Sequence, residues 1–540
     1  MNISYFLVLF AVYNIANCYK ILAIFPFGSV SHHIIGEATL RALVEAGHEV
    51  TIISSLKTKN PTENFKEIII PDPMKVIMKG LNSIRSILSN FASYRFLFLD
   101  QTFNAFKFAK TMPSIIAELF LFNMGGKAVE HIMEQEIVQK LLNSNEKFDA
   151  VFVEVFAVDA LFGFGQRFNC PVIGVTTFDG VYWNDVYTGN VSPYSYVPMV
   201  FYGLPDEMNF MQRLENTIFS ILEKIFYNFY HLPNQKKLYE KYFPDAKNSF
   251  DLIHKNISLV FSNSHLSTSS ARPLMPNMID IGGVHVNPPK ALPKDIQDFL
   301  DSAIDGAILF SMGSAVQSTD WKPQQREAFV NVFGKLKQKV LWKYENETLP
   351  GKPGNIKIGK WIPQRDIVAH PNVKAFITHG GQCGTTEALY KGVPLLGIPL
   401  FGDQIMNINR AVLKGYALSL DFQDITEESF GSALNEILTN PKYEKAAKKV
   451  SRISKDRPMS PKETVVYWTE HVIRHQGADH LKSAARNLNY FEFYLFDVYA
   501  TLIGGFLIFS IVSIKIFLMI FMKVCGKKTS DESKRKLKKQ

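Results

Sequence analysis

The sequence predicts an α/β protein with two Rossmann-like, doubly wound domains and one membrane-spanning helix near its C-terminus. Two patterns predict the domains. Short buried strands alternate with helix-length segments in both halves of the chain, and a proline-rich stretch, 287–293, lies between the halves. A third pattern predicts the membrane helix, because residues 498–521 are almost wholly apolar and long enough to cross a bilayer.

The first half, 19–286, begins with an apolar strand that a loop and a helix-length segment follow. The strands predicted in this half are Ile21–Phe25, His48–Ile53, Ala150–Val155, Val172–Thr176 and Leu259–Ser262. Two mostly helical, apolar segments, 74–146 and 208–242, interrupt the alternation. They either wall a binding pocket or pack as ordinary core helices, and no residue in them separates these alternatives.

The second half, 294–487, repeats the alternation and ends in a helical stretch that begins near Thr439 and runs back toward the membrane. Its predicted strands are Ala307–Ser311, Val340–Lys343, Ile356–Gly359, Ala375–Thr378 and Pro394–Ile398. Two such halves joined by a linker leave a cleft that faces the carboxyl ends of both sheets. Ligands bind at this edge in open α/β folds.

The two ends of the chain predict its membrane topology. An apolar run, 5–15, followed by small residues predicts a signal peptide, 1–18, with cleavage after Cys18. The predicted span, 498–521, contains Lys515, which can reach the interface, and a lysine-rich tail, 522–540, follows it. By the positive-inside rule the tail is cytosolic and the rest of the mature chain is lumenal.

Two further features agree with a main part that lies in the lumen of the endoplasmic reticulum. Glycosylation sequons begin at Asn190, Asn256 and Asn346, all in the predicted lumenal part. Lysines three and five positions from the C-terminus resemble a dilysine retrieval signal. A generic basic tail that binds anionic headgroups is an equal alternative. We therefore predict a single-pass protein of the endoplasmic reticulum membrane.

Composition excludes several other classes of protein. The chain has 540 residues, 47% hydrophobic and 20% charged, so it is not disordered. Its net charge is +9, but from Lys523 onward eight basic residues face two acidic ones, so the folded part is near neutral. A nucleic-acid partner is therefore not expected. The four cysteines are scattered, which predicts neither a zinc site nor a disulfide framework.

A dense group of functional residue types follows the predicted strand 375–378. That strand ends in His379-Gly380-Gly381, and a helix starts near Cys383. Glycines at a strand-to-helix turn let backbone N–H groups approach a ligand, and the helix N-terminus attracts anions, so the turn predicts a pyrophosphate site. Four other side chains can bind a nucleotide sugar: Trp361 by stacking on uracil, Glu387 at the ribose, and Asp403 and Gln404 at the hexose hydroxyls.

Taken together, these residues closely resemble the signature of the UDP-glycosyltransferase family, in its membrane-anchored animal form. The signature here is WIPQ…HP…FITHGG…E…GVP…P…DQ…N, and Phe25-Pro26, Ser31-His32, Ile281-Gly-Gly283 and Phe310–Ser314 also match. The resemblance implies a GT-B fold whose first half binds the acceptor and whose second half binds the UDP-sugar. It also implies inverting, metal-independent transfer in one displacement. The donor-binding residues that it implies are Ser311, Gly313, Trp361, Gln364, His379, Gly380, Gly381, Gly384, Glu387, Asp403 and Gln404.

The family's Ser-His pattern assigns the catalytic base to His32. A histidine titrates in the working range of pH, so it is the usual general base, and His33 would point about 100° away around the helix. Such a base is usually held by a carboxylate. Glu154 occupies the position of the family's aspartate, and Asp159 lies five residues on. Either residue can serve, and we favour Asp159 because its shorter side chain has fewer geometries.

Donor and acceptor are the open parts of this prediction. Ser262 stands where many glucuronosyltransferases have arginine, so we expect UDP-glucose and not UDP-glucuronate as the donor. A UDP-glucuronosyltransferase and a catalytically silent UDP-sugar-binding subunit are the alternatives. The acceptor is expected to be small and lipophilic, in either detoxification or the glycosylation of one endogenous compound. No cofactor or metal is expected, and a homo-oligomer stays an open alternative.

Overall fold

The computed structural model describes residues 18–58, 60–77, 114–246, 248–254, 257–314 and 316–537. By its contacts the chain divides into two compact units, Met1–Ser483 and Ala484–Gln540. The predicted signal peptide lies outside the described residues except for its last residue, Cys18, so it stays a prediction. The predicted domain boundaries inside the first unit stay predictions as well.

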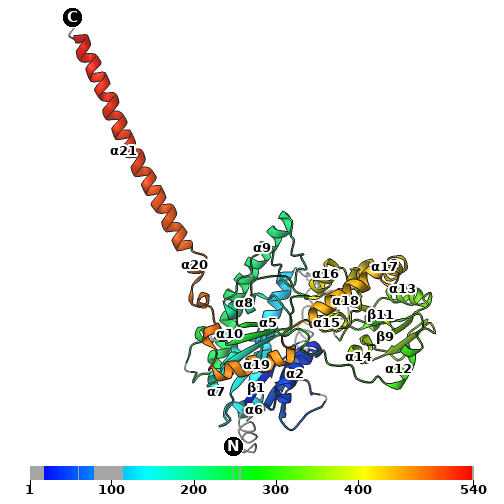
Figure 1. Ribbon diagram of the computed structural model, residues 1–540. Helices are drawn as coiled ribbons and strands as arrows, with labels where there is room; N and C mark the ends of the chain where they lie inside the picture. The colour runs from blue at the N-terminus through cyan, green and yellow to red at the C-terminus, as the bar shows by residue number, and fades with distance from the viewer. Residues whose placement is uncertain are drawn as a thin grey trace, which may run out of the picture. The chain divides into compact units, whose positions relative to one another are not determined.

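A seven-stranded sheet organises the first half of the chain (Figure 1). Its strands are β1 (Lys20–Phe25), β2 (Glu49–Ser54), β3 (Phe65–Ile69), β4 (Ala150–Glu154), β5 (Val172–Thr176), β6 (Leu259–Ser262) and β7 (Met278–Asp280). They run in the order β3-β2-β1-β4-β5-β6-β7, and every neighbouring pair is parallel. The sequence analysis did not predict β3 and β7, the two edge strands.

Alternate residues of the central strands enter two different cores, so both faces of this sheet are covered. On β1, Leu22 and Ile24 belong to one core, and Ile21 and Ala23 belong to the other. The helices and helical turns of this half are α2 (Val30–Glu45), α5 (Ser114–Met133), α6 (Glu136–Leu142), η2 (Asp159–Phe162), α7 (Gly163–Phe168), α8 (Tyr182–Thr188), α9 (Phe210–Phe226), η3 (Tyr227–His231), α10 (Leu232–Tyr242) and α11 (Phe250–His254). This covering confirms the doubly wound architecture.

A second parallel sheet, of six strands, organises the other half. Its strands are β8 (Ala307–Ser311), β9 (Lys339–Lys343), β10 (Ile356–Gly359), β11 (Val373–Thr378), β12 (Leu395–Gly397) and β13 (Ala417–Ser419), in the order β10-β9-β8-β11-β12-β13. Its helices and helical turns are α12 (Lys294–Asp301), η4 (Ser318–Asp320), α13 (Pro323–Gly334), α14 (Gln364–Val368), α15 (Gln382–Lys391), α16 (Gln404–Leu413), η5 (Phe422–Asp424), α17 (Glu427–Thr439) and α18 (Pro441–Lys455).

Each sheet has one point where the strand order reverses. In the first sheet, β1 has β2 on one side and β4 on the other, and in the second, β8 lies between β9 and β11 in the same way. Crossover loops leave such a point in opposite directions, so the carboxyl ends of the two central strands frame the place where ligands bind in open α/β sheets. The fold therefore supplies one such place in each half.

The helix α19 (Pro461–Arg474) returns from the second half to the first. Its Val465 and Val472 are fully buried in the core that contains β1 and α2. Lys462 adds an ion pair with Glu45 at 2.9 Å. Because this helix completes the core of the other half, the two sheets belong to one compact unit.

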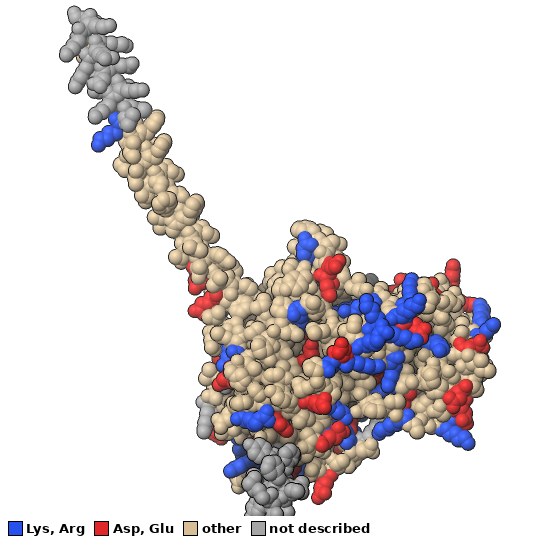
Figure 2. Space-filling view, viewed as in Figure 1, with Lys and Arg blue, Asp and Glu red and all other residues tan. Residues whose placement is uncertain are grey.

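The second unit contains η7 (Ala484–Asn487), α20 (Tyr490–Phe493) and the long helix α21 (Phe496–Leu537), which the short turn η6 (Asp479–Leu481) precedes in the chain. Residues Phe496–Lys523 are long and apolar enough to cross a membrane, with a mean hydropathy of 2.4. Figure 2 shows this stretch almost without charged side chains. The predicted span, 498–521, lies inside it.

Basic side chains gather on one part of the second half, where Figure 2 shows a group of Lys and Arg at the place of α18. This helix exposes six basic residues, namely Lys442, Lys445, Lys448, Lys449, Arg452 and Lys455. Such a row is the solvated face of an amphipathic helix, whose opposite face buries Tyr443 and Ala447.

Candidate active site

His32 and Glu154 meet at the reversal point of the first sheet. His32 lies in the first turn of α2, directly after the β1 loop, and Glu154 is the last residue of β4. The imidazole Nδ1 hydrogen-bonds the Glu154 carboxylate, which is almost fully buried, whereas the His32 side chain keeps 15% of its surface exposed. An ionised carboxylate only accepts hydrogen bonds, so Nδ1 is the protonated nitrogen and Nε2 carries the lone pair.

Asp159 is not the partner of His32, so our preference for Asp159 over Glu154 is reversed. The Asp159 carboxylate is fully buried and accepts hydrogen bonds from four side chains: His231 at 2.5 Å, His254 at 2.9 Å, and Tyr187 and Tyr227 at 2.8 Å each. The chain turns after β4 through Ala157, whose φ is +57°, and this turn carries Asp159 into the helical core. The two histidines lower the pKa of Asp159 well below its usual value and outweigh the opposing effect of burial.

Aromatic rings line the same end of the first sheet beside His32. The ring of Phe156 lies 5.1 Å from the imidazole centroid, and that of Phe178 lies 6.0 Å away, both edge to face. Phe27 and Trp183 continue the group through contacts with Phe156. One side of His32 is therefore lined by apolar rings.

His379 begins the turn His379-Gly380-Gly381, called the glycine turn below, between β11 and α15 at the reversal point of the second sheet. A Cβ atom on Gly313 would lie 2.5 Å from the imidazole Cε1, and one on Gly381 would lie 2.6 Å from Nε2. Gly313 also has a φ of +73°, a conformation that favours glycine. A side chain at either position would therefore force the imidazole to shift. The hydroxyl of the buried Ser311 accepts a hydrogen bond from the Gly313 N–H at 3.3 Å, which orders the turn after β8.

The glycine turn leads into α15 and leaves polar groups for a ligand. Gly381 caps α15, and no described side chain bonds the first N–H groups of this helix. Burial lowers the pKa of His379 to about 4, with a smaller contribution from Lys343, so the imidazole is neutral at physiological pH. Among the described residues, its buried Nδ1 has no hydrogen-bond partner. A neutral imidazole and a free helix N-terminus together suit a phosphate ligand.

Gln364 and Glu387 form a second polar pair beside this turn. The Gln364 amide donates to a Glu387 oxygen at 2.8 Å, and Gly384, in the same helix, leaves room for that amide. Burial raises the pKa of Glu387 to about 7, although Gln364 and Arg365 oppose the shift.

Trp361 precedes this pair in the chain, two residues after the end of β10, and 58% of its surface is exposed. That is unusually open for a large aromatic side chain, and a ring so exposed can offer a face to a base.

Asp403 and Gln404 begin α16. Asn407 donates to the Asp403 carboxylate at 2.7 Å, and its amide also donates to the Gly380 carbonyl at 3.0 Å, which ties α16 to the glycine turn. Burial raises the pKa of Asp403, while the Asn407 bond and the nearby His32 oppose the shift. The Gln404 amide oxygen accepts from the N–H groups of Leu400 and Phe401.

Direct contacts join the two halves at this site. The Cys383 thiol, at the start of α15, lies 3.7 Å from the carbonyl oxygen of Ser31, the residue before His32. Gln382 donates to the carbonyl oxygen of Asn263 at 3.2 Å. The predicted base and the predicted phosphate turn are thus neighbours. Among the described residues, no group of three His, Cys, Asp or Glu side chains could hold a metal ion.

The aromatic residues beside His32 were missed by the sequence analysis. Phe156 and Phe178 follow β4 and β5, and their position after neighbouring strands was the only available signal. With 43 phenylalanines in the chain, this signal is weak.

Comparison with solved structures identifies the class of the fold as GT-B glycosyltransferase. The glycosyltransferase VinC in complex with DTDP superimposes with a TM-score of 0.53 at 15% identity, over 84% of this chain and 100% of that one. A UDP-glucose:anthocyanidin 3-O-glucosyltransferase in complex with UDP gives 0.53 at 17% identity, over 84% and 99%. At such low identities the likeness concerns the fold alone.

Sequence comparison then identifies the family. The family model described as "UDP-glucoronosyl and UDP-glucosyl transferase" matches residues 20–531. UDP-glycosyltransferase UGT5 of Dactylopius coccus is 36% identical over 97% of this chain and 95% of its own length. UDP-glucuronosyltransferase 2B15 of Rattus norvegicus is 30% identical over 96% of each. The chain belongs to this family and is an enzyme that transfers a sugar from a UDP-sugar.

Proposed function

We propose that this enzyme transfers glucose from UDP-glucose to a small lipophilic acceptor, with inversion at the anomeric carbon and with His32 as the general base. The observation that carries the proposal is the pairing of His32 with Glu154 next to the glycine turn of the other half. In the proposed mechanism, the base and the anion site lie on opposite sides of one reaction centre.

The proposed reaction is a single displacement. The His32 Nε2 removes the proton from the acceptor's nucleophilic atom, which attacks the anomeric carbon as the bond from that carbon to the UDP oxygen breaks. Glu154 keeps the imidazole in the required tautomer and stabilises the imidazolium that forms. The N-terminus of α15 and His379 stabilise the negative charge on the leaving pyrophosphate, so no metal is required.

The donor is proposed to lie along the second half from Trp361 to α16. Trp361 stacks on uracil, and Glu387, which Gln364 orients, accepts from the ribose hydroxyls. Asp403 and Gln404 bind the hexose hydroxyls. Because the Gln404 oxygen is already occupied, its amide N–H group is the part that faces the sugar. The apolar rings of Phe156 and Phe178 favour an aromatic acceptor beside His32.

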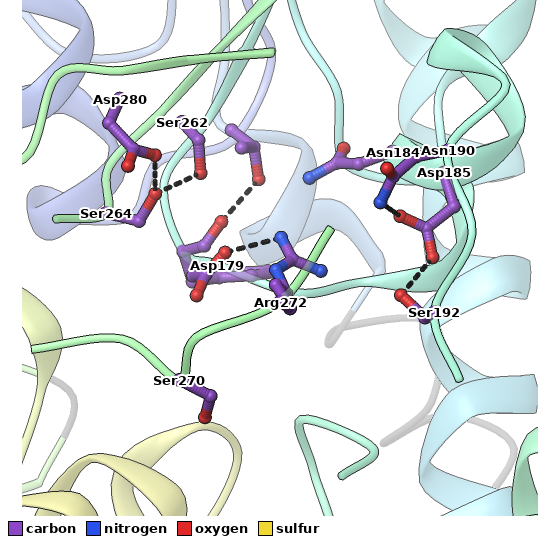
Figure 3. Close-up of polar contacts among 12 residues, drawn as sticks. Asp179, Asn184, Asp185, Asn190, Ser192, Ser262, Ser264, Ser270, Arg272 and Asp280 are labelled. Atoms are coloured by element: carbon purple, nitrogen blue, oxygen red, sulfur yellow. Dashed lines mark hydrogen bonds and ion pairs between the residues drawn. The ribbon is translucent and has the colours of Figure 1, made fainter. Parts of the chain in front are cut away.

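Donor preference follows from the surroundings of Ser262. Its hydroxyl lies 2.9 Å from that of Ser264, which in turn donates to Asp280 (Figure 3). Ser262 thus supplies no cation at this position for a glucuronate carboxylate. We expect kcat/KM for UDP-glucose to exceed that for UDP-glucuronate by about 10-fold or more, the value of a charge-assisted hydrogen bond. Turnover with each donor and one phenolic acceptor measures this ratio, and a preference for glucuronate would overturn the assignment.

The affinity for UDP-glucose is expected to depend on pH through Glu387. With a pKa of about 7, this carboxyl is mostly protonated at pH 6 and then accepts poorly from the ribose, so the Kd should be about 10-fold higher at pH 6 than at pH 8. Calorimetric titration without acceptor measures the change. The Glu387→Gln variant should bind UDP-glucose more weakly, and its Kd should not depend on pH in this range.

The stability of the protein should change in the opposite direction to its affinity for UDP-glucose. The free energy of unfolding should fall as pH rises through about 7, because the folded state holds the Glu387 proton more tightly than the unfolded state.

The proposed location is the membrane of the endoplasmic reticulum, with the catalytic part in the lumen and the basic tail in the cytosol. The apolar helix Phe496–Lys523 and the basic residues after it support this orientation.

A further inference from the structure

One buried carboxylate connects the acceptor side of the site to the donor side. Asp179 follows Phe178, whose ring lies beside His32, and only 5% of the Asp179 residue is exposed. Arg272, from the segment after β6, donates to Asp179 Oδ1 at 2.6 Å (Figure 3). This bond lies entirely within the first half of the chain.

The other oxygen of Asp179 faces the second half. Its Oδ2 lies 3.7 Å from Nη1 of Arg410, on α16, and among the described residues it has no hydrogen-bond partner. Arg410 also donates to the Ser270 hydroxyl at 2.8 Å, and that hydroxyl donates to Asp206 at 2.5 Å. One arginine of α16 is therefore held by two segments of the first half.

The remainder of α16 packs closely against the same half. Asn409 donates to the carbonyl oxygen of Gly203 at 2.7 Å. A Cβ atom on Gly203, whose φ is +69°, would lie 2.3 Å from the Ile405 side chain. No methyl group fits between Gly203 and the Ile405 side chain as they lie, so α16 is in close contact with the first half here.

The charges in this contact are retained. Burial opposes the ionisation of Asp179, but Arg272 and Arg410 outweigh it and lower the pKa of the carboxyl. Asp179 is thus an anion at neutral pH, shared between two arginines. Removal of either charge leaves a buried ion with fewer partners, which is costly in a low-dielectric surrounding.

We propose that Asp179 and Arg410 are positioning residues. They hold the start of α16, which we assign to donor binding, at a fixed position relative to Phe178 beside His32. This inference rests on the proposed function, because it assigns Asp403 and Gln404 to the hexose and His32 to the acceptor. Phe178 adjoins Asp179, and Arg410 lies on the helix that Gln404 begins. The ion pair therefore sets the distance between the two substrates, on which transfer depends steeply.

An Arg410→Met variant tests this role, because methionine keeps an apolar stem without the charge. We expect kcat with UDP-glucose to fall about 10- to 100-fold, because misplacement of a reactant by about 1 Å can cost about 100-fold, while KM for UDP-glucose and the Kd of UDP stay within about 2-fold. Arg410→Lys should recover most of kcat. Arg452→Met, on the exposed face of α18, is the matched control and should leave kcat, KM and Tm unchanged.

The Asp179→Asn variant and the double variant complete the test. Each single change should lower kcat, and the double variant should be no worse than the more impaired single, since both remove one interaction. Wild-type kcat in Arg410→Met, or additive losses in the double variant, would overturn the positioning role. Loss of UDP binding in Arg410→Met would also overturn it. Absence of transfer by the wild type in the same assay would instead refute the proposed function, and this inference with it.

Discussion

Replacement of His32 by alanine is expected to abolish most sugar transfer and to leave UDP binding unchanged. A positioned general base contributes about 10²–10⁴-fold to a rate, so kcat should fall by a factor in that range. UDP binding should be unchanged because the residues assigned to the nucleotide all lie in the second half. The measurement compares kcat and the Kd of UDP in wild type and variant.

Two further variants sharpen this test. Glu154→Gln keeps the shape of the side chain but removes the charge that orients His32, so it should lower kcat strongly with little change in Tm. His475→Ala is the matched control, because it removes an exposed histidine that has no role in the proposed mechanism, and it should behave as wild type. Undiminished turnover in His32→Ala would exclude this residue from the mechanism.

Replacement of Asp159 by alanine is expected to destabilise the protein more than any change at the active site. The carboxylate is the shared acceptor of His231, His254, Tyr187 and Tyr227, all buried. Its removal leaves these four buried donors without their shared acceptor, and each unsatisfied buried group typically costs about 1–3 kcal/mol. Thermal unfolding of the detergent-solubilised protein should show a Tm lower by several degrees or more.

The same variant separates a structural role from a catalytic one. The Asp159→Asn variant keeps the shape but not the charge, and it should also unfold at lower temperature. Turnover per folded molecule should be retained in either variant, since Asp159 makes no hydrogen bond to His32. The assignment would be wrong if either variant had wild-type stability together with a kcat as low as that of Glu154→Gln.

Much of the fold could be predicted because its central strands carry strong local patterns. Strands such as Val172–Thr176 and Ala307–Ser311 are short apolar runs that the structure buries on both faces. The missed strands were β3, β7 and β13. The first two end one sheet and the third ends the other, and β7 and β13 have only three residues each.

The carboxylate partner of His32 could not be chosen from the sequence, because the choice depends on a turn. Glu154 and Asp159 are five residues apart, and their separation in the chain says nothing about where each points. The chain turns at Ala157, which has a left-handed backbone conformation, and Asp159 lies after this turn. Alanine rarely adopts that conformation, so the sequence does not predict the turn. Side-chain length, on which our preference for Asp159 rested, carries no information about direction.

The contacts between the two halves could not be predicted from the sequence either. Asp179, Arg272 and Arg410 come from three distant segments, and none lies in a pattern that indicates pairing. In contrast, the turn His379–Gly381 could be predicted, because its three residues are consecutive and directly follow an apolar strand.

The most direct test of the account is acceptor-dependent release of UDP from UDP-glucose by microsomes that contain the full chain. A mixed pool of small phenolic and apolar acceptors serves as the second substrate, and UDP-glucuronate is assayed in parallel. The account predicts UDP release that requires an acceptor, that is faster with UDP-glucose and that is lost in His32→Ala. Microsomes that bind UDP but release none from either donor would contradict it and would indicate a silent UDP-sugar-binding subunit.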